Sequence, residues 1–137
     1  MGRTAASLCL LLALVMALAA CSSDGKKEPD LNLVPTNARQ EILDTMKKAL
    51  ADPTNVRDAY ISDPVLTSTG KEQRYTACVR YNARDGSRRY VGSTDRIGYF
   101  YGGHLNQLVE ATKEQCGNAV YKPFPELEKL CQATKCE

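Results

Sequence analysis

The apolar residues of this chain follow two spacings, one typical of a helix and one typical of strands. From Asn37 onward they recur every three or four residues, at Ile42, Leu43, Met46, Ala49 and Leu50. This spacing predicts an amphipathic helix, and Asn37 with Gln40 three residues later matches a helix-capping arrangement. Asp52-Pro53 should end the helix, because the residue before a proline avoids the helical region.

Two segments after the helix are predicted strands. Val56 to Ile61 is the first, with Ala59 and Ile61 on one face. The second is Arg74 to Asn82, in which two sets of residues alternate along the chain. One set is Tyr75, Ala77, Val79 and Tyr81, and the other is Arg74, Thr76, Cys78 and Arg80. A period of two indicates a strand with one buried face.

Further extended segments follow, joined by turns. They are, in order, the turn Asp85-Gly86-Ser87, a long extended segment made of Tyr90 to Gly92 and Ile97 to Tyr101, the turn Gly102-Gly103, and a last strand from His104 to Ala111. Gly102-Gly103 predicts a two-residue hairpin turn. We expect bulges near Gly92 and Gly98, because a glycine inside a strand often marks one.

The C-terminal part adds short helical segments. Thr112 to Ala119 can make a helical turn around Cys116. Pro125 suits a first helical position, and the acidic Glu126 and Glu128 beside it favour a helix N-terminus. We therefore expect an α+β fold with an N-terminal amphipathic helix, an antiparallel meander of three to four strands, a short C-terminal helix and disulfide bonds.

The N-terminal residues have a different pattern. Arg3 is the one charged residue before position 21, and Leu8 to Ala20 is an apolar run of thirteen residues. A membrane-spanning helix needs about 20 apolar residues. The run is therefore short for a permanent span and fits the core of a signal peptide that is removed.

The end of this run, Leu18-Ala19-Ala20-Cys21, resembles the lipobox of bacterial lipoprotein precursors. The resemblance implies cleavage before Cys21 and acylation of its thiol. Ser22 to Pro35 is polar, contains two prolines and shows no periodicity. We therefore expect a signal peptide at 1–20, an acylated linker at 21–35 and a single small domain at 36–137. An ordinary secretory signal beside a chance cysteine is the alternative.

Acylation would be sufficient to hold the protein at a membrane, because each buried methylene contributes about 0.8 kcal/mol. By resemblance to the sorting of Gram-negative lipoproteins, Ser22 after the acylated cysteine implies the outer membrane, with the domain on its periplasmic side. The inner membrane and the cell surface remain alternative locations.

Composition and charge narrow the classes of partner. A chain of 137 residues, with 43% apolar and 25% charged residues, is typical of one folded domain. Loss of residues 1–20 removes Arg3 alone and leaves 17 basic and 16 acidic residues, a net charge near +1. This small charge gives no reason to expect a nucleic acid as partner.

The chemical state of each of the six cysteines depends on this processing. Cys9 leaves with the signal peptide and Cys21 is acylated, so Cys78, Cys116, Cys131 and Cys136 remain in an oxidising compartment. Four cysteines permit three connectivities, and we expect a local Cys131–Cys136 bond and therefore a Cys78–Cys116 bond. A zinc site with His104 and a thioredoxin-like site are alternatives that lack the Cys-x-x-Cys spacing. We expect neither a metal nor a cofactor.

The tract from Arg74 to Arg96 is basic and rich in tyrosine. It contains six arginines and two aspartates, which gives it a local net charge of +4. Arginine and tyrosine concentrate at binding hot spots. The candidate partner surface consists of Arg80, Tyr81, Arg84, Arg88, Arg89 and Tyr90. The alternative is a solvated hairpin whose arginines keep an edge strand from aggregating.

The chain offers no arrangement that predicts catalysis. His104 is the only histidine, and the Gly-x-Ser-x-Gly elbow of serine hydrolases is absent from the sequence. Glu110, Glu114, Glu126 and Glu128 offer carboxylates for a glycosidase-like pair, but a charged solvent face also accounts for them. We therefore expect no catalytic residues.

Four short sequences of the mature part stand out, Asp52-Pro53-Thr54-Asn55-Val56-Arg57-Asp58-Ala59, Cys78-Val79-Arg80-Tyr81-Asn82-Ala83, Glu114-Gln115-Cys116-Gly117-Asn118-Ala119 and Pro123-Phe124-Pro125-Glu126-Leu127. They resemble small, uncharacterised outer-membrane lipoproteins of alphaproteobacteria. The resemblance implies an exported domain and transfers neither catalytic residues nor a ligand. We expect a non-enzymatic structural or protein-interaction role, with an envelope protein or peptidoglycan as partner. An inhibitor of a periplasmic hydrolase such as lysozyme and a cell-wall hydrolase are the alternatives.

Overall fold

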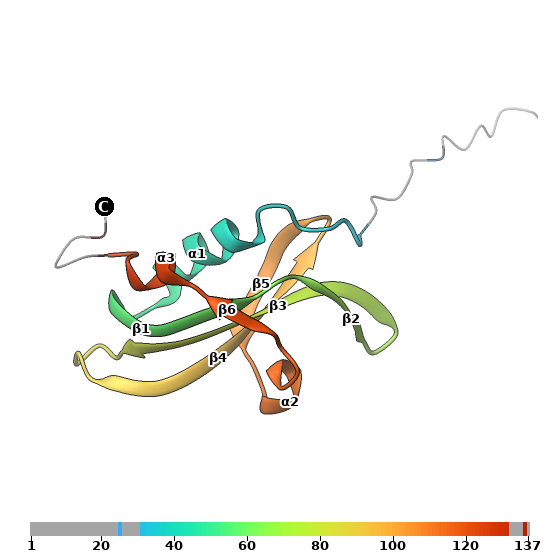
Figure 1. Cartoon of the computed structure of the whole chain (residues 1–137). Coiled ribbons are helices and arrows are strands. Elements are labelled where there is room, and N and C mark those ends of the chain that lie inside the picture. The colour runs from blue at the N-terminus through green and yellow to red at the C-terminus, as the bar shows by residue number, and fades with distance from the viewer. Residues whose placement is uncertain (1–24, 26–30, 132–135, 137) are drawn as a thin grey trace, which may run out of the picture.

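An open antiparallel sheet of six strands organises the chain, with helices on both of its faces (Figure 1). In chain order the elements are α1 (Ala38–Ala49), β1 (Asp52–Ser62), β2 (Val65–Thr69), β3 (Glu72–Arg84), β4 (Tyr90–Tyr101), β5 (His104–Glu110), α2 (Lys113–Cys116), β6 (Tyr121–Pro123) and α3 (Pro125–Glu128). They belong to a computed structural model that describes residues 25, 31–131 and 136. α1 and α3 lie on one face of the sheet and α2 lies on the other.

The strands follow the order β5-β4-β3-β1-β6, and β2 pairs with β3 in addition. β1 and β2 lie end to end along one side of β3. The expectation of three to four strands is therefore wrong, because β2 and β6 are additional and β5 is not the last strand. β2 follows Pro64, which interrupts the backbone ladder. β6 has three residues, too few to show a period in the sequence.

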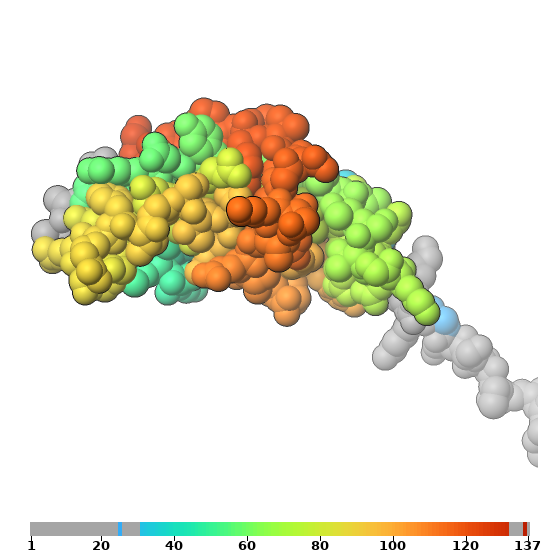
Figure 2. All heavy atoms as spheres, turned by 90° about the horizontal axis from the view of Figure 1, so that it is seen from below, coloured from blue at the N-terminus to red at the C-terminus, as the bar shows by residue number. Residues whose placement is uncertain are grey.

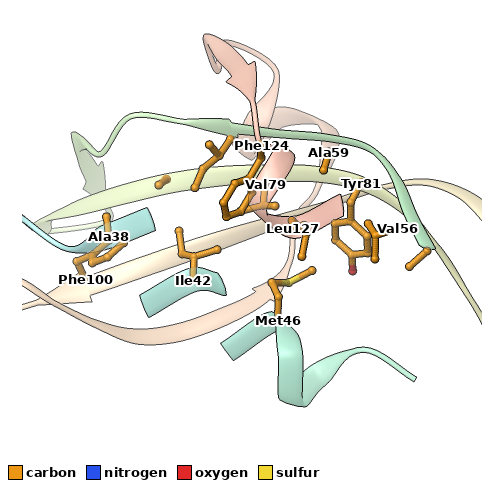
Figure 3. Packing of buried hydrophobic residues seen from close by; sticks show 13 residues of the cluster. Ala38, Ile42, Met46, Val56, Ala59, Val79, Tyr81, Phe100, Phe124 and Leu127 are labelled. Carbon is orange, nitrogen blue, oxygen red and sulfur yellow. The ribbon is translucent and has the colours of Figure 1, made fainter. Parts of the chain in front are cut away.

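The main core lies between the sheet and the helices α1 and α3. Ile42 and Met46 of α1 are completely buried, as are Phe124 and Leu127 near the C-terminus. Figure 3 shows the two α1 side chains pointing toward the sheet and Leu127. Burying one such side chain contributes about 1.5–3 kcal/mol. α1 ends at Ala49, ahead of the proline at the start of β1.

The central strand β3 is buried on both faces in its middle. Ala77, Val79 and Tyr81 face the main core, as their alternation predicts. Cys78 faces the other way and forms a second buried cluster with Ile97. The expectation of one buried face is thus incomplete, because α2 covers part of the opposite face.

Glycines form one turn and lie at or near both expected bulges. Gly102 and Gly103 have φ values of 57° and 82° and form the predicted two-residue turn between β4 and β5. Gly92, with a φ of 94°, lies where the β3–β4 pairing shifts register, which confirms the first bulge. The second bulge is also found near Gly98, because the β4–β5 pairing shifts register between Tyr99 and Phe100, whereas Gly98 itself pairs in register with both neighbouring strands. A Cβ there would lie 2.9 Å from Cδ1 of Leu105, so glycine leaves room for that side chain.

Disulfides connect distant and local parts of the chain. Cys78 of β3 is bonded to Cys116 of α2, with Cα atoms 5.9 Å apart, which confirms this predicted pairing. The structure also joins Cys131 to Cys136, with Cα atoms 4.9 Å apart. The expected signal peptide at 1–20 and the acylated cysteine lie outside the described residues. Within the described part, no helix is long and apolar enough to cross a membrane.

Candidate functional site

The face of the sheet opposite α1 carries a cleft of about 700 Å³. β2 forms one wall, and α2 with the chain that leads to β6 forms the other. Figure 2 looks onto this face, where the orange α2 segment lies next to the light-green β2–β3 hairpin. The lining residues are Ser62, Asp63, Val65, Thr67, Ser68, Thr69, Thr76, Cys78, Ile97, Tyr99, Glu114, Gln115, Asn118, Ala119 and Val120.

The floor of the cleft combines a disulfide with hydroxyl groups. The Cys78–Cys116 bond is buried beneath it. Thr67 Oγ1 of the β2 wall lies 2.9 Å from Thr76 Oγ1 of the floor, and Ser62 Oγ accepts a hydrogen bond from the Cys78 N–H at 2.8 Å. These hydroxyl groups are therefore satisfied within the fold, and each retains a lone pair that it can offer to a ligand.

The α2 wall is connected to the floor at several points. Thr112 and Gln115 form a capping box, in which the Thr112 N–H donates to Gln115 Oε1 at 2.8 Å. Gln115 Nε2 also donates to the hydroxyl of Tyr99 on β4 at 2.9 Å. The disulfide at Cys116 adds a covalent link. This wall therefore has a defined position relative to the sheet.

The β2 wall is a sheet edge that the described residues leave open. β2 pairs with β3 alone, since β6 covers the same side of the sheet only at β1. The two-residue turn Gly70-Lys71 joins β2 to β3, and such a turn is closed by a hydrogen-bonded pair, here Thr69 and Glu72. Because hydrogen-bonded and non-hydrogen-bonded pairs alternate, the backbone groups of Leu66 and Ser68 point away from β3, toward the free edge.

The six residues predicted to form a partner surface do not share one surface. Tyr81 is 4% exposed and belongs to the core, where its hydroxyl accepts a hydrogen bond from Arg96 Nε at 2.9 Å. Arg80 points to the opposite face, because neighbouring residues of a strand alternate. It donates to both carboxylate oxygens of Asp95, at 2.7 and 2.8 Å, and these bonds raise the pKa of Arg80. The inclusion of Tyr81 in a surface is therefore wrong.

The remaining four lie around the β3–β4 turn, and two of them are engaged by β1. Arg84 Nη2 donates to Thr54 Oγ1 at 2.7 Å, and its Nε lies 3.1 Å from Asp52 Oδ2. The hydrogen bond from the Thr54 side chain, with the charge of Arg84 as a smaller cause, lowers the pKa of Asp52. The Tyr90 hydroxyl donates to the carbonyl of Asn55 at 2.7 Å.

Arg88 and Arg89 are the exposed members of the predicted set. Arg89 has 79% of its side chain exposed and lies 3.4 Å from Asp85. A residue outside the tract joins them, since the guanidinium of Arg57 stacks 4.2 Å from the centre of the Tyr90 ring. The structure therefore contains a basic end at the β3–β4 turn, formed by Arg57, Arg84, Arg88, Arg89 and Tyr90.

Several of the residues considered for catalysis have partners in the fold. His104 Nδ1 lies 2.8 Å from Glu41 Oε1, and Glu126 forms an ion pair with Arg39 at 2.7 Å. Glu114 lines the cleft. Across the part of the chain that the structure describes, no group of three His, Cys, Asp or Glu side chains could hold a metal ion.

Comparisons with known proteins leave the family of this fold open. No family model, no curated protein and no solved structure matches the chain. Its function must therefore be inferred from the cleft, the free edge of β2 and the N-terminal sequence.

The cleft was not foreseen from the sequence. A signal for its β2 wall exists, because Val65, Thr67 and Thr69 alternate ahead of the turn residue Gly70. The pattern is only five residues long and follows Pro64, which weakens it as a strand signal. The other wall depends on the Cys78–Cys116 bond, which the sequence did predict.

Proposed function

We propose that this protein is a non-enzymatic lipoprotein of the bacterial envelope, acylated on Cys21 and held on the periplasmic side of the outer membrane, where its domain binds another protein. The lipobox-like sequence before Cys21 and the polar linker after it support the anchor. The Cys78–Cys116 disulfide supports export, because disulfides persist in oxidising compartments and are rare in the cytosol. Ser22 supports the outer membrane as the destination.

The observation that carries the binding role is the open edge of β2 beside the cleft. An exposed strand edge offers backbone N–H and C=O groups that pair readily with another extended chain, and most proteins protect such edges with charged side chains or proline. Val65–Thr69 contains neither a charged residue nor a proline. We infer that an extended segment of the partner protein adds to β2 as a further strand.

The cleft would give this strand addition its specificity. Alternate side chains of an added strand point to the same face of the sheet, so every second one would enter the cleft beside Val65 and Thr67. The lining combines apolar side chains with hydroxyl groups, and Asp63, one of its carboxylates, is paired with Lys122. A partner segment with small apolar or hydroxyl-bearing side chains at alternate positions fits this lining.

A photoreactive amino acid at Val65 tests the site in intact envelopes. Val65 lines the cleft and is 57% exposed, and Val91, which is 63% exposed and lies near the basic end, is the matched control position. We expect Val65 to yield an adduct with one partner protein, joined through an extended segment of that protein. Val91 should not yield this adduct.

Substitutions at Ser68 decide whether the partner adds as a strand. Ser68→Pro removes an N–H from the free edge while sparing the β2–β3 ladder, and Ser68→Ala keeps that N–H. We expect Ser68→Pro to abolish the Val65 adduct and Ser68→Ala to preserve it. An adduct that survives Ser68→Pro would contradict strand addition. Capture of glycan or of a cell-wall hydrolase would favour peptidoglycan binding or inhibition instead.

A further inference from the structure

Exposed apolar side chains gather where the chain joins the domain. Leu31, Leu33 and Val34 are 38%, 51% and 62% exposed. The Gly102 N–H donates to the Leu31 carbonyl at 3.2 Å, and a Cβ added to Gly103 would lie 3.4 Å from Cβ of Leu33. Residues 31–34, the approach segment, therefore pack on the turn between β4 and β5 and form part of the folded surface.

The body of the domain adds two exposed apolar side chains at the same end, which strand alternation places on opposite faces of the sheet. Leu66 of β2 is 47% exposed and Tyr101 of β4 is 40% exposed. Figure 1 shows the β2–β3 and β4–β5 turns at the end where the approach segment lies, and the β3–β4 turn at the opposite end. Figure 2, seen after a quarter turn, also shows the light-green β2–β3 hairpin and the yellow β3–β4 turn at opposite ends. The apolar end consists of Leu31, Leu33, Val34, Leu66 and Tyr101.

We propose that the apolar end rests on the lipid surface of the membrane to which the protein is anchored. This inference builds on the anchor at Cys21 proposed above. Nine residues separate Cys21 from Leu31. A chain of this length spans at most about 35 Å when fully extended. The anchor therefore keeps this end of the domain near the bilayer.

The chemistry of the apolar end fits the boundary between lipid headgroups and acyl chains. Leucine and valine side chains gain about 25 cal/mol for each Å² of apolar surface that leaves water. Tyrosine is enriched at this boundary because its ring is apolar and its hydroxyl is polar. Arg74 stacks 4.7 Å from the centre of the Tyr101 ring, and its charge can remain among the headgroups.

Acylation makes a small patch sufficient. A free domain with so few exposed apolar side chains would bind a bilayer weakly. Once the acyl chains hold the protein, docking of the apolar end becomes an intramolecular step with a high effective concentration. The patch then needs only enough affinity to orient the domain.

Single tryptophans test this docking, because the natural chain contains no tryptophan. Val34→Trp and Leu66→Trp place a probe on the approach segment and on β2. Val91→Trp is the matched control, since Val91 and Val34 are 63% and 62% exposed but lie at opposite ends of the domain. The acylated mature protein is reconstituted into phosphatidylethanolamine and phosphatidylglycerol vesicles, with and without bromine on the acyl chains as a contact quencher.

We expect Val34→Trp and Leu66→Trp to emit at shorter wavelength on the vesicles and to lose emission to the brominated lipid, while Val91→Trp is unchanged. Quenching of Val34→Trp alone would overturn the proposal, because closeness of the tether would then explain it without docking of the domain. Equal quenching at all three positions, or none in protein that floats with the vesicles, would also overturn it and leave the anchor intact. Acylated protein that does not float would contradict the anchor itself and the docking with it.

Discussion

At the scale of single residues, strand alternation decides which side chains of the Arg/Tyr tract reach a partner. Arg80 and Tyr81 are neighbours in sequence, yet one pairs with Asp95 on the cleft face and the other is buried in the main core. Arg84 is held by β1, whereas Arg89 extends into solvent. A tract that is uniformly basic in sequence is therefore divided in the fold between structural and exposed arginines.

Charge reversal at two of these arginines should separate the two roles. The side chains of Arg84 and Asp52 are 21% and 13% exposed, so Arg84→Glu places two carboxylates together in a poorly hydrated site. We expect this change to lower the free energy of unfolding by about 2 to 4 kcal/mol. Arg89→Glu, at a side chain that is 79% exposed, should change it by less than about 0.5 kcal/mol.

Urea unfolding of the two variants measures this difference, with the wild-type protein as reference. Equal stability of the two variants would show that the contact between Arg84 and β1 contributes little to the fold.

At the scale of elements, the second face of the sheet depends on the disulfide. α2 has four residues, too few to be stable on its own backbone hydrogen bonds. The cluster beneath it has three buried residues, Cys78, Ile97 and Cys116, with the partly buried Tyr99, Ala111, Ala119 and Tyr121 packed against them. The covalent bond between β3 and α2 therefore has a large part in holding this wall of the cleft.

Removal of each disulfide in turn should show that the two bonds contribute unequally to the free energy of unfolding. Cys78→Ala with Cys116→Ala opens a loop of sequence separation 38. In the chain-entropy picture this loss lowers the free energy of unfolding by about 3 to 4 kcal/mol. Cys131→Ala with Cys136→Ala opens a loop of separation 5, for which we expect a smaller loss, about 2 kcal/mol. Chemical denaturation of both double variants checks the order, and the reverse order would contradict it.

The elements that the sequence predicted are those whose own residues carry the signal. β3 alternates from Arg74 to Asn82, and the diglycine between β4 and β5 matches one turn type. β6 was missed because its three residues are a strand only through pairing with β1. A bulge was expected near Gly98, but the room that glycine leaves for Leu105 depends on a residue of the next strand and was not predicted. The cleft could not be predicted, because its walls are brought together by tertiary contacts.

At the scale of the whole molecule, the candidate surfaces lie at different places on an elongated domain. The approach segment and the apolar end are at one end, and the basic end at the β3–β4 turn is at the other (Figure 1). The cleft opens on the face of the sheet between them. Docking of the apolar end on the membrane would therefore direct the basic end into the periplasm.

The mass of the protein extracted from the membrane fraction tests the central claim most directly, that the chain is a lipoprotein anchored at Cys21. We predict an N-terminal peptide that begins at Cys21 and carries the mass of a diacylglyceryl group. The Cys21→Ala variant should lack the acyl mass and remain unprocessed or become soluble. A mature N-terminus at another residue, or a Cys21→Ala variant that is processed and retained at the membrane like the wild type, would contradict the claim.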